Sequence, residues 1–277
     1  MTSRASEAAL LTREALANGA GRVIAVGGDG TLNEVVNGYL DDTGHPINPD
    51  ASLSLLPSGT GSDFCRSLGF KTRMDAVRAA INPEAKLIDA ARCEFKDSNG
   101  QDASRFFINI ASFGLGGDTV SLVNRWRDQL PRWIGGRARY IAAAVRALAS
   151  YRNVSVTVRL NDQPDIRINS NLIVVANGRF AGGGMMLAPH AQFDDELFDV
   201  VLADRATRLD VIRELPRIQR GGHLKNPRVK QLRAREVSIN SDQPLAIDID
   251  GEIAGHTPAR LTLLPSVVKF AGVMDDA

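Results

Sequence analysis

The stretch GGDGTLNEVVNG (Gly27–Gly38) follows the apolar run RVIAV (residues 22–26), and together they decide how the start of the chain folds. An apolar run, a glycine-rich turn and an amphipathic segment in this order predict a strand, a tight turn and a helix. Glycines at the end of a strand let a ligand approach the backbone, and the first turn of the helix offers free N–H groups to a phosphate. The stretch therefore predicts a phosphate-binding turn.

Neither common nucleotide fingerprint fits this turn. The motif GxxxxGK[ST] requires a lysine that is absent, and GxGxxG fails because Asn33 stands where the last glycine belongs. Asp29 is unusual here, since a carboxylate repels polyphosphate unless Mg²⁺ or a substrate proton lies between them. A metal-linked role for Asp29 and a role as a cap of the helix beginning near Thr31 both stay open on these residues alone.

Composition limits the classes of function. The 277 residues are 44% hydrophobic and 23% charged, which is typical of a soluble globular protein, and the net charge of +1 gives no overall attraction to nucleic acid. The two cysteines indicate neither a disulfide framework nor a zinc site, and no HExxH or GxSxG motif supports a hydrolase. Without a signal peptide or a long apolar window, we expect a cytoplasmic protein whose membrane contact is peripheral.

The order of the segments predicts two kinds of structure. A helix over Ala5–Ala17, the strand and helix around the glycine turn, and a second strand, turn and helix in residues 51–69 alternate as in a doubly wound parallel α/β sheet. Beyond about Asp89, short runs rich in Val and Ile with alternating polar residues favour antiparallel β structure. Two helices are expected within this part, at Gly136–Tyr151 and Thr207–Gly221.

The longer motifs resemble the diacylglycerol kinase catalytic domain family, which includes bacterial lipid kinases and the sphingosine and ceramide kinases. The matching strings, in the order of that family, are GGDGTLNEVVNG, PSGTGSDFCRSLG (57–69), KLIDAAR (86–92), FINIASFGLGGD (107–118), VANGRFAGGGMMLAP (175–189) and DIDGE (248–252). The resemblance covers nearly the whole chain. It implies an ATP-binding α/β domain over residues 1–91, a mostly antiparallel β-sandwich domain for the lipid over 92–263, and a return of residues 264–277 to the first domain.

The resemblance also implies an activity. We expect an ATP-dependent lipid kinase that uses ATP and Mg²⁺ to phosphorylate the hydroxyl of a diacylglycerol-type lipid, in a cleft between the two domains. NAD kinases share the shorter string GGDGT, so a soluble kinase of that kind is one alternative. A non-catalytic lipid-binding member of the family is another.

Site residues follow from the resemblance, position by position. Glu252 matches the proton acceptor, and Asp250 and Asp29 complete the predicted catalytic set. Asp250 and Glu252 stand two residues apart, so a strand would place both carboxylates on one face. The positions expected to contact the nucleotide are Thr2, Gly27, Gly28, Asp29, Gly30, Thr31, Leu32, Asn33, Glu34, Gly59, Thr60, Asp63 and Asp89.

A structural Mg²⁺ site is implied by the stretch APHAQFDDELFDV (188–200), which resembles a metal-binding loop of bacterial members. Its ligands would be the side chains of Gln192 and Asp195 and the carbonyl of Leu197, all of them oxygen donors as Mg²⁺ requires. Glu196 stands where the family usually has glycine. An acidic, solvated loop is the alternative interpretation.

Two further expectations concern membranes and the start of the chain. Seven arginines lie between Ser121 and Arg152 against one acidic residue, with Trp126 and Trp133 among them, which suits peripheral contact with an anionic membrane. An ordinary helical hairpin with a solvated arginine face is the alternative. Family members begin with a strand and an Asn-Pro-x-Ser-Gly-like loop, which this sequence lacks at its start; the missing part would be one βαβ start of about 40 residues. Either the true start lies upstream of Met1 or the protein is a degenerate member of the family. Relatives also suggest a homodimer.

Overall fold

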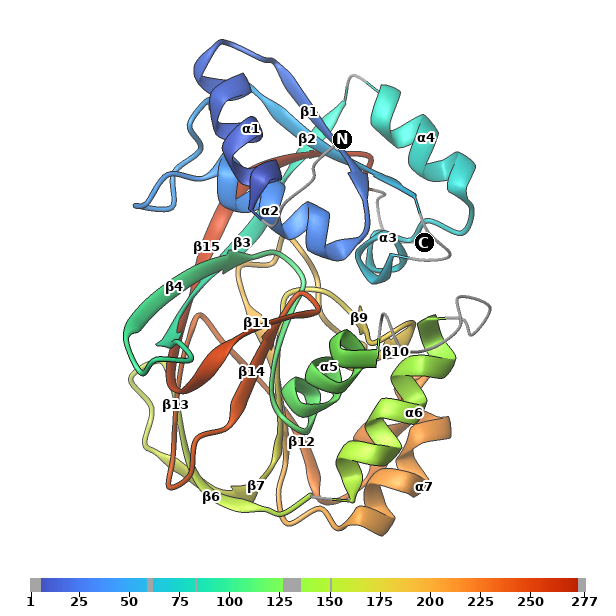
Figure 1. Ribbon diagram of the computed structural model, residues 1–277, viewed down its shortest axis with the longest axis vertical. Helices are drawn as coiled ribbons and strands as arrows, with labels where there is room; N and C mark the ends of the chain where they lie inside the picture. Colours follow the sequence, from blue (N-terminus) through green and yellow to red (C-terminus); the bar gives the residue numbers. More distant parts are fainter. Residues whose placement is uncertain (1–5, 59–61, 83, 127–135, 150, 274–277) are drawn as a thin grey trace.

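The computed structural model describes residues 6–58, 62–82, 84–126, 136–149 and 151–273. Its α/β part lies at the top of Figure 1 and its β-rich part below. The helices are α1 (Glu7–Ala17), α2 (Asp29–Tyr39), α3 (Asp63–Ser67), α4 (Arg73–Ile81), α5 (Leu115–Trp126), α6 (Gly136–Leu148), α7 (Arg208–Ile218) and the 3₁₀ helix η1 (Gly222–Lys225). The strands are β1 (Arg22–Gly27), β2 (Ser52–Pro57), β3 (Ala85–Lys96), β4 (Asp102–Phe107), β5 (Ile110–Gly114), β6 (Val154–Leu160), β7 (Ile166–Ser170), β8 (Leu172–Ala176), β9 (Phe180–Ala181), β10 (Met185–Met186), β11 (Phe198–Ala203), β12 (Val229–Ala234), β13 (Glu236–Ser241), β14 (Ala246–Ile249) and β15 (Glu252–Ala271).

The α/β part is built from parallel strands, as the alternation of segments predicts. Strands β1 and β2 pair in parallel along their whole length, and the far end of β15 joins them where Phe270 lies opposite Leu53. Both of these side chains are fully buried in a core with Leu32 of α2. Within the described residues β1 pairs with β2 alone, and Ile24 and Val26 on it are 45% and 61% exposed. A further strand ahead of the chain stays a prediction.

The β-rich part is antiparallel, again as predicted. Its strands follow the order β12-β11-β8-β5-β14-β15-β13-β6-β7 in the sheet. Strand β6 alternates buried and more exposed residues, so one face of it packs into the core through Val156 and Val158. Phe107 and Phe198 stack in the same core, with ring centroids 6.1 Å apart. Together with the α/β part, this gives the α/β plus β fold class that the sequence predicts.

Helices α5, α6 and α7 lie beside the β-rich part (Figure 1). The expected helices are present as α6 and α7, but α5 was not anticipated, because its first turn carries two glycines that disfavour a helix. Those glycines permit close packing: a Cβ on Gly116 would lie 2.2 Å from the Ser112 hydroxyl, and one on Gly117 would lie 2.7 Å from the Ala246 carbonyl. Across the described residues, no helix is both long and apolar enough to span a bilayer.

Strands β3 and β15 connect the two parts (Figure 1). They pair antiparallel over most of their length, with irregular register between Leu264 and Val268. Residues 264–271 of β15 run beside β2 and β3, in the α/β part. Strand β3 continues through residue 91, so the domain boundary predicted there falls within a strand, and that division stays a prediction.

Asp89 on β3 ties three segments together at this junction. Its buried carboxylate accepts hydrogen bonds from Glu196 N and Ser266 N, each at 2.8 Å. Its carbonyl accepts one from Asn177 Nδ2 at 3.0 Å, and its own N–H donates to Phe193 O at 2.6 Å. Burial raises the pKa of this carboxyl group. The Asp89 side chain therefore links β3 to the loop before β11 and to β15. Its predicted contact with a nucleotide stays a prediction.

We expect Asp89→Asn to destabilise the chain. An amide offers only one acceptor oxygen to two N–H donors, and its NH₂ group would face one of them in a buried site. Urea unfolding should show a loss of about 1–3 kcal/mol. The control is Asp204→Asn, where the partly exposed carboxylate accepts, among the described residues, only the N–H of Asn169. A change within about 0.5 kcal/mol is expected there. Equal losses for the two variants would contradict the role given to Asp89.

Candidate active site

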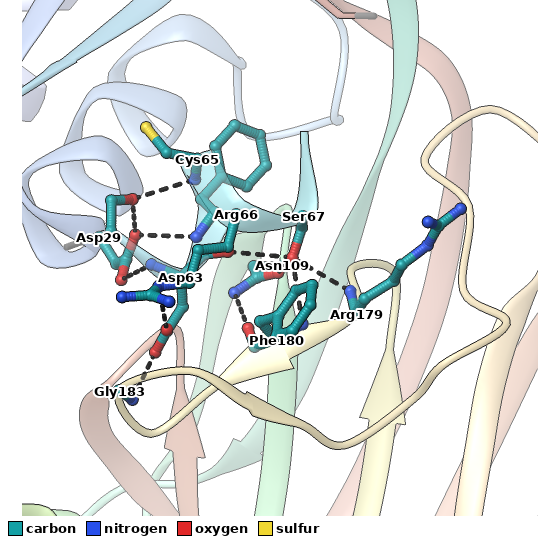
Figure 2. Close-up of polar contacts among 11 residues, drawn as sticks. Asp29, Asp63, Cys65, Arg66, Ser67, Asn109, Arg179, Phe180 and Gly183 are labelled. Carbon is teal, nitrogen blue, oxygen red and sulfur yellow. Dashed lines mark hydrogen bonds and ion pairs between the residues drawn. The ribbon is translucent and has the colours of Figure 1, made fainter. Parts of the chain in front are cut away.

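Asp29 joins the first glycine-rich turn to residues 62–64 at the start of α3 (Figure 2). This residue begins α2, directly after its N-cap Gly28. Its carboxylate accepts hydrogen bonds from the Ser62 hydroxyl, from Asp63 N at 3.0 Å and from Phe64 N at 3.2 Å. Asp29 therefore holds the start of α3. It does not cap α2, which was one of the two interpretations of this residue from the sequence. The side chain links the first glycine-rich turn to the start of α3.

The glycines of the first turn have different roles. A Cβ on Gly27 would lie 2.3 Å from the Thr31 hydroxyl, and one on Gly30 would lie 2.9 Å from Glu252 Oε1. Within the described residues, a Cβ on Gly28 would meet nothing within 4 Å. Gly27 and Gly30 thus allow the turn to pack tightly against the chain, whereas Gly28 faces open space where a ligand could approach the backbone.

Helix α3 connects the α/β part to the β-rich part through two of its side chains (Figure 2). Asp63, which is almost fully buried, accepts a hydrogen bond from Gly183 N at 2.7 Å. The Ser67 hydroxyl accepts two more, from Arg179 N and Phe180 N, both at 3.1 Å. Gly183 lies in the short connection between β9 and β10. The carboxylate and the hydroxyl therefore fix the hairpin to the α/β part.

Asp250 occupies the tight turn between β14 and β15, with φ of 50°. Its carboxylate, which is only 6% exposed as a residue, accepts four hydrogen bonds. Three come from consecutive backbone N–H groups: Ile108 at 3.3 Å, Asn109 at 3.2 Å and Ile110 at 3.0 Å. The fourth comes from Asn33 Nδ2 at 2.9 Å. The Asp250 carboxylate thus fixes its turn to α2 and to the β4–β5 connection, and its predicted catalytic role stays a prediction.

Asn33 is the partner of Asp250 on α2, and it is fully buried. Its amide nitrogen donates also to Phe106 O at 3.0 Å, while its amide oxygen accepts a hydrogen bond from Arg105 Nε at 2.7 Å. Every polar atom of the side chain is therefore paired. A glycine at this position, as in GxGxxG, could make none of these contacts.

Glu252 begins β15 and is partly buried beside Gly30, at the start of α2. Among the described residues its carboxylate accepts no hydrogen bond, in contrast with Asp250. The expectation that the two carboxylates share a strand face is wrong, because Asp250 and Gly251 form the turn and both have positive φ. The turn directs the Asp250 carboxylate to the backbone donors, whereas the Glu252 carboxylate keeps its acceptor oxygens available.

Asp248 is an acidic residue of this site that the sequence interpretation missed. It lies on β14, is 6% exposed and accepts a hydrogen bond from the Ser112 hydroxyl at 3.0 Å. Its other carboxylate oxygen is buried and has no hydrogen-bond partner in the described part of the chain. Burial raises its pKa to about 8, with smaller contributions from the charges of Asp250 and Glu252. The alternation of acids in DIDGE is the signal that could have indicated it.

The acidic residues of the two turns also influence one another. Burial, and after it the charge of Asp29, raise the pKa of Asp63 to about 6. Burial likewise raises the pKa of Asp250 to about 6, against the effect of its hydrogen bonds, and Asp29 again adds to the shift. This mutual repulsion between carboxylates is what a bound cation relieves.

Binding of a magnesium ion that arrives with a nucleotide stays a prediction for this site. Asp29, Asp63 and Glu252 offer carboxylate oxygens, which Mg²⁺ prefers, and Mg²⁺ commonly shares such ligands with substrate phosphates. Over the ranges that the structure describes, no group of three or more His, Cys, Asp or Glu side chains is arranged to hold an ion by itself.

Several other predicted nucleotide contacts have side chains that are engaged within the protein. Leu32 is 1% exposed in the core, and the Glu34 carboxylate accepts the N–H of Ala8 at 3.1 Å. For both, contact with a nucleotide stays a prediction. Three of the predicted residues lie outside the described part of the chain: Thr2, Gly59 and Thr60.

The expected structural Mg²⁺ site is not formed. Asp195 Oδ1 accepts the N–H of Leu197 at 3.2 Å, and Asp195 Oδ2 is in ion-pair contact with Arg233. Gln192 is exposed and lines a hollow that Arg233 also lines. Glu196 keeps φ of 59°, a conformation that favours glycine. Because a guanidinium stands at the central carboxylate, the residues present do not fit a cation.

Comparisons with known proteins agree with this architecture. Residues 1–93 match the family model of the diacylglycerol kinase catalytic domain, and residues 111–272 match the model of the YegS C-terminal NAD kinase beta sandwich-like domain. The crystal structure of a diacylglycerol kinase from Bacillus anthracis superimposes with a TM-score of 0.69 at 20% identity, covering 99% of this chain and 85% of that one. The fold is therefore of the diacylglycerol kinase and NAD kinase-like class.

The sequences of curated proteins narrow the identification from a fold class to a family. A diacylglycerol kinase of Staphylococcus carnosus is 30% identical over 269 residues, which cover 97% of this chain and 82% of that protein. A Chromohalobacter salexigens protein named "Probable lipid kinase YegS-like" is 31% identical over 266 residues, covering 94% and 79%. The chain belongs to the diacylglycerol kinase family, whose members compared here carry the names of lipid kinases.

The raised pKa of Asp248 predicts a measurable pH dependence of stability. Above about pH 4 an unfolded aspartate has lost its proton, whereas the folded chain keeps the proton on Asp248 until the pH approaches the raised pKa of about 8. The folded state binds more protons in this window, so Asp248 lowers the free energy of unfolding as pH rises, by up to about 1.4 kcal/mol per pH unit.

Asp248→Asn removes this titration and can still accept a hydrogen bond from Ser112. Between pH 5 and pH 8, urea unfolding should therefore show a smaller fall in stability for the variant than for the wild type. Asp63 titrates in both proteins, so its contribution cancels in the comparison. Parallel curves for the two proteins would show that Asp248 does not keep a proton in the folded chain.

Proposed function

We propose that this chain is an ATP-dependent lipid kinase that transfers the γ-phosphate of ATP to a hydroxyl of a diacylglycerol-type lipid in phospholipid metabolism. The observation that carries the proposal is the setting of Glu252, a carboxylate without a hydrogen-bond partner among the described residues, held beside Gly30 at the start of α2. Membership of the diacylglycerol kinase family supports the kind of reaction.

In the proposed reaction the chain mainly positions its two substrates. The open backbone at Gly28 and the first N–H groups of α2 receive the phosphates of ATP. Glu252 accepts the proton of the lipid hydroxyl while the hydroxyl oxygen forms a bond to the γ-phosphorus of ATP. The bond between the γ-phosphorus and the oxygen that bridges it to the β-phosphate breaks, which releases ADP. Asp250 and Asn33 keep the turn that precedes Glu252 in place. When bound with the nucleotide beside Asp29 and Asp63, Mg²⁺ supplies charge neutralisation at the phosphates.

Two alternatives remain as outcomes of the test. A soluble kinase would phosphorylate a ribose hydroxyl such as that of NAD, and a non-catalytic family member would transfer no phosphate. The names of the curated relatives favour a lipid acceptor. The extension TLNEVVNG of the first motif favours the same choice, because NAD kinases share only GGDGT with this chain.

We expect labelled lipid when the chain is incubated with γ-³²P-labelled ATP, Mg²⁺ and mixed micelles of diacylglycerol, phosphatidylglycerol or sphingosine, and no labelling of NAD. Glu252→Gln should lower kcat by about 10²–10⁴-fold, the usual contribution of a general base. A matched control is Glu236→Gln, a half-exposed residue paired with Arg260 at a distance from the site, which should keep wild-type activity.

Labelling of NAD alone would replace the proposal with the soluble-kinase alternative. Absence of transfer to any acceptor, from a folded protein, would favour the non-catalytic alternative. Full activity of Glu252→Gln would leave the lipid kinase in place but overturn the role of Glu252.

We also propose peripheral contact with anionic membrane through the arginine-rich segment that begins in α5. Arg125 is exposed and Trp126 partly exposed at the end of this helix, whereas Trp133 lies outside the described residues. A tryptophan beside basic groups suits the headgroup region, where its ring is apolar and the charges meet anionic lipids.

Replacing Trp126 and Trp133 together by alanine should reduce the fraction of protein that floats with phosphatidylglycerol liposomes. Flotation with neutral phosphatidylcholine liposomes serves as the control and should be weak for both proteins. Unchanged flotation of the double variant with anionic liposomes would remove the segment from the proposed membrane contact.

A further inference from the structure

The loop before β11 and the neighbouring strand β12 bring an arginine between two carboxylates. Asp199 on β11 pairs directly with Arg233 on β12, and the guanidinium extends from there to Asp195 in the loop. Arg233 Nε lies 3.9 Å from Asp199 Oδ2, while the opposite end of the guanidinium contacts Asp195 Oδ2. One cationic group thus lies against both acidic residues.

The two carboxylates are withdrawn from water. The side chain of Asp199 is fully buried and that of Asp195 is 16% exposed, whereas Arg233 keeps 46% of its side chain exposed. Asp199 Oδ1 is also hydrogen-bonded, by the Gln231 amide. Carboxylates held in this way need a nearby positive charge, because transfer from water strongly penalises an unpaired ion. Among the described residues, Arg233 is the cation in contact with both.

The loop itself is shaped around Asp195 by its backbone. Leu197 N donates to Asp195 Oδ1, and Glu196 N donates to Asp89, which anchors the loop to β3. Glu196 keeps the left-handed φ of 59° although it is not glycine, and its side chain pairs with Arg235. The loop therefore holds its conformation through contacts within the protein.

A guanidinium can replace a divalent ion in such a place. It is permanently charged, offers several donors in a fixed plane and is weakly hydrated, whereas Mg²⁺ gives up its water reluctantly and demands near-octahedral oxygen ligands. With Arg233 present, Asp195 has Leu197 N at one oxygen and the guanidinium at the other. Neither oxygen is left for an ion without displacement of the arginine.

We propose that Arg233 takes the place of a structural divalent cation at Asp195, so that the loop and β11 are stabilised without metal. This goes beyond the proposed kinase function and does not depend on it. Any need of the enzyme for Mg²⁺ then comes from the nucleotide and not from this loop.

The test measures metal binding in the absence of nucleotide. Thermal unfolding of the full chain is followed in EDTA and in MgCl₂, and bound Mn²⁺ is counted by electron paramagnetic resonance. In the wild type we expect no ion whose binding depends on Asp195, so Asp195→Asn leaves the Mn²⁺ count and the response of Tm to Mg²⁺ unchanged.

Arg233→Ala removes the guanidinium and leaves both carboxylates. We expect this variant to have a lower Tm in EDTA and to bind one additional Mn²⁺, and MgCl₂ at roughly ten times the dissociation constant should raise its Tm by about 3 °C. Adding Asp195→Asn to Arg233→Ala should remove both the extra ion and the Tm rise. Arg235→Ala, which removes the neighbouring arginine from exposed Glu196, should behave like the wild type.

A wild-type ion that Asp195→Asn abolishes would overturn the proposal. So would an Arg233→Ala protein that folds yet binds no additional ion, because the arginine would then not occupy a cation site. If Arg233→Ala does not fold in EDTA, its recovery in MgCl₂ supports the proposal and failure to recover contradicts it. Whether or not Arg233→Ala folds, comparing the wild type with Asp195→Asn decides whether the wild type binds an ion at Asp195.

Discussion

The candidate active site depends on one buried carboxylate that accepts four hydrogen bonds. Asp250 binds three consecutive backbone N–H groups of the β4–β5 connection and the amide of Asn33 on α2. These segments come from distant parts of the sequence, and the Asp250 carboxylate links α2, the β4–β5 connection and the β14–β15 turn. Since Asp250 is almost fully buried, loss of its carboxylate would leave several donors unpaired at once.

The acidic residues of the site have different roles. The carboxylates of Asp29 and Asp250 accept hydrogen bonds that fix the start of α3 and the β14–β15 turn, whereas that of Glu252 accepts none from the described residues. Gly30 leaves room for Glu252 at the start of α2, where free N–H groups face the proposed nucleotide. Phosphoryl transfer needs positioning and charge stabilisation more than covalent help, so a chain that fixes its turns this firmly is suited to it.

Much of the fold could be predicted from local pattern, because periodicity and turn residues report which face of a segment is buried. The strand, turn and helix around Gly27, the parallel α/β part and the antiparallel part all follow from it. Contacts between distant residues leave no such pattern. The partner of Asp29 at α3, the four donors to Asp250 and the arginine opposite Asp195 could not be predicted in this way. The helix α5 was missed because its glycines oppose helix formation, yet close packing on Ser112 and Ala246 requires them.

In the proposed reaction Glu252 accepts the proton, and Asp250 positions the turn that precedes Glu252. The most direct test is the pH dependence of kcat for lipid phosphorylation in the wild type, Asp250→Asn and Glu252→Gln, using samples shown to be folded at the assay temperature. A general base makes kcat rise with pH through its own pKa. We expect Asp250→Asn to be slower but to keep this rise, and Glu252→Gln to lose it. A rise that persists in Glu252→Gln and disappears in Asp250→Asn would contradict the account and make Asp250 the base.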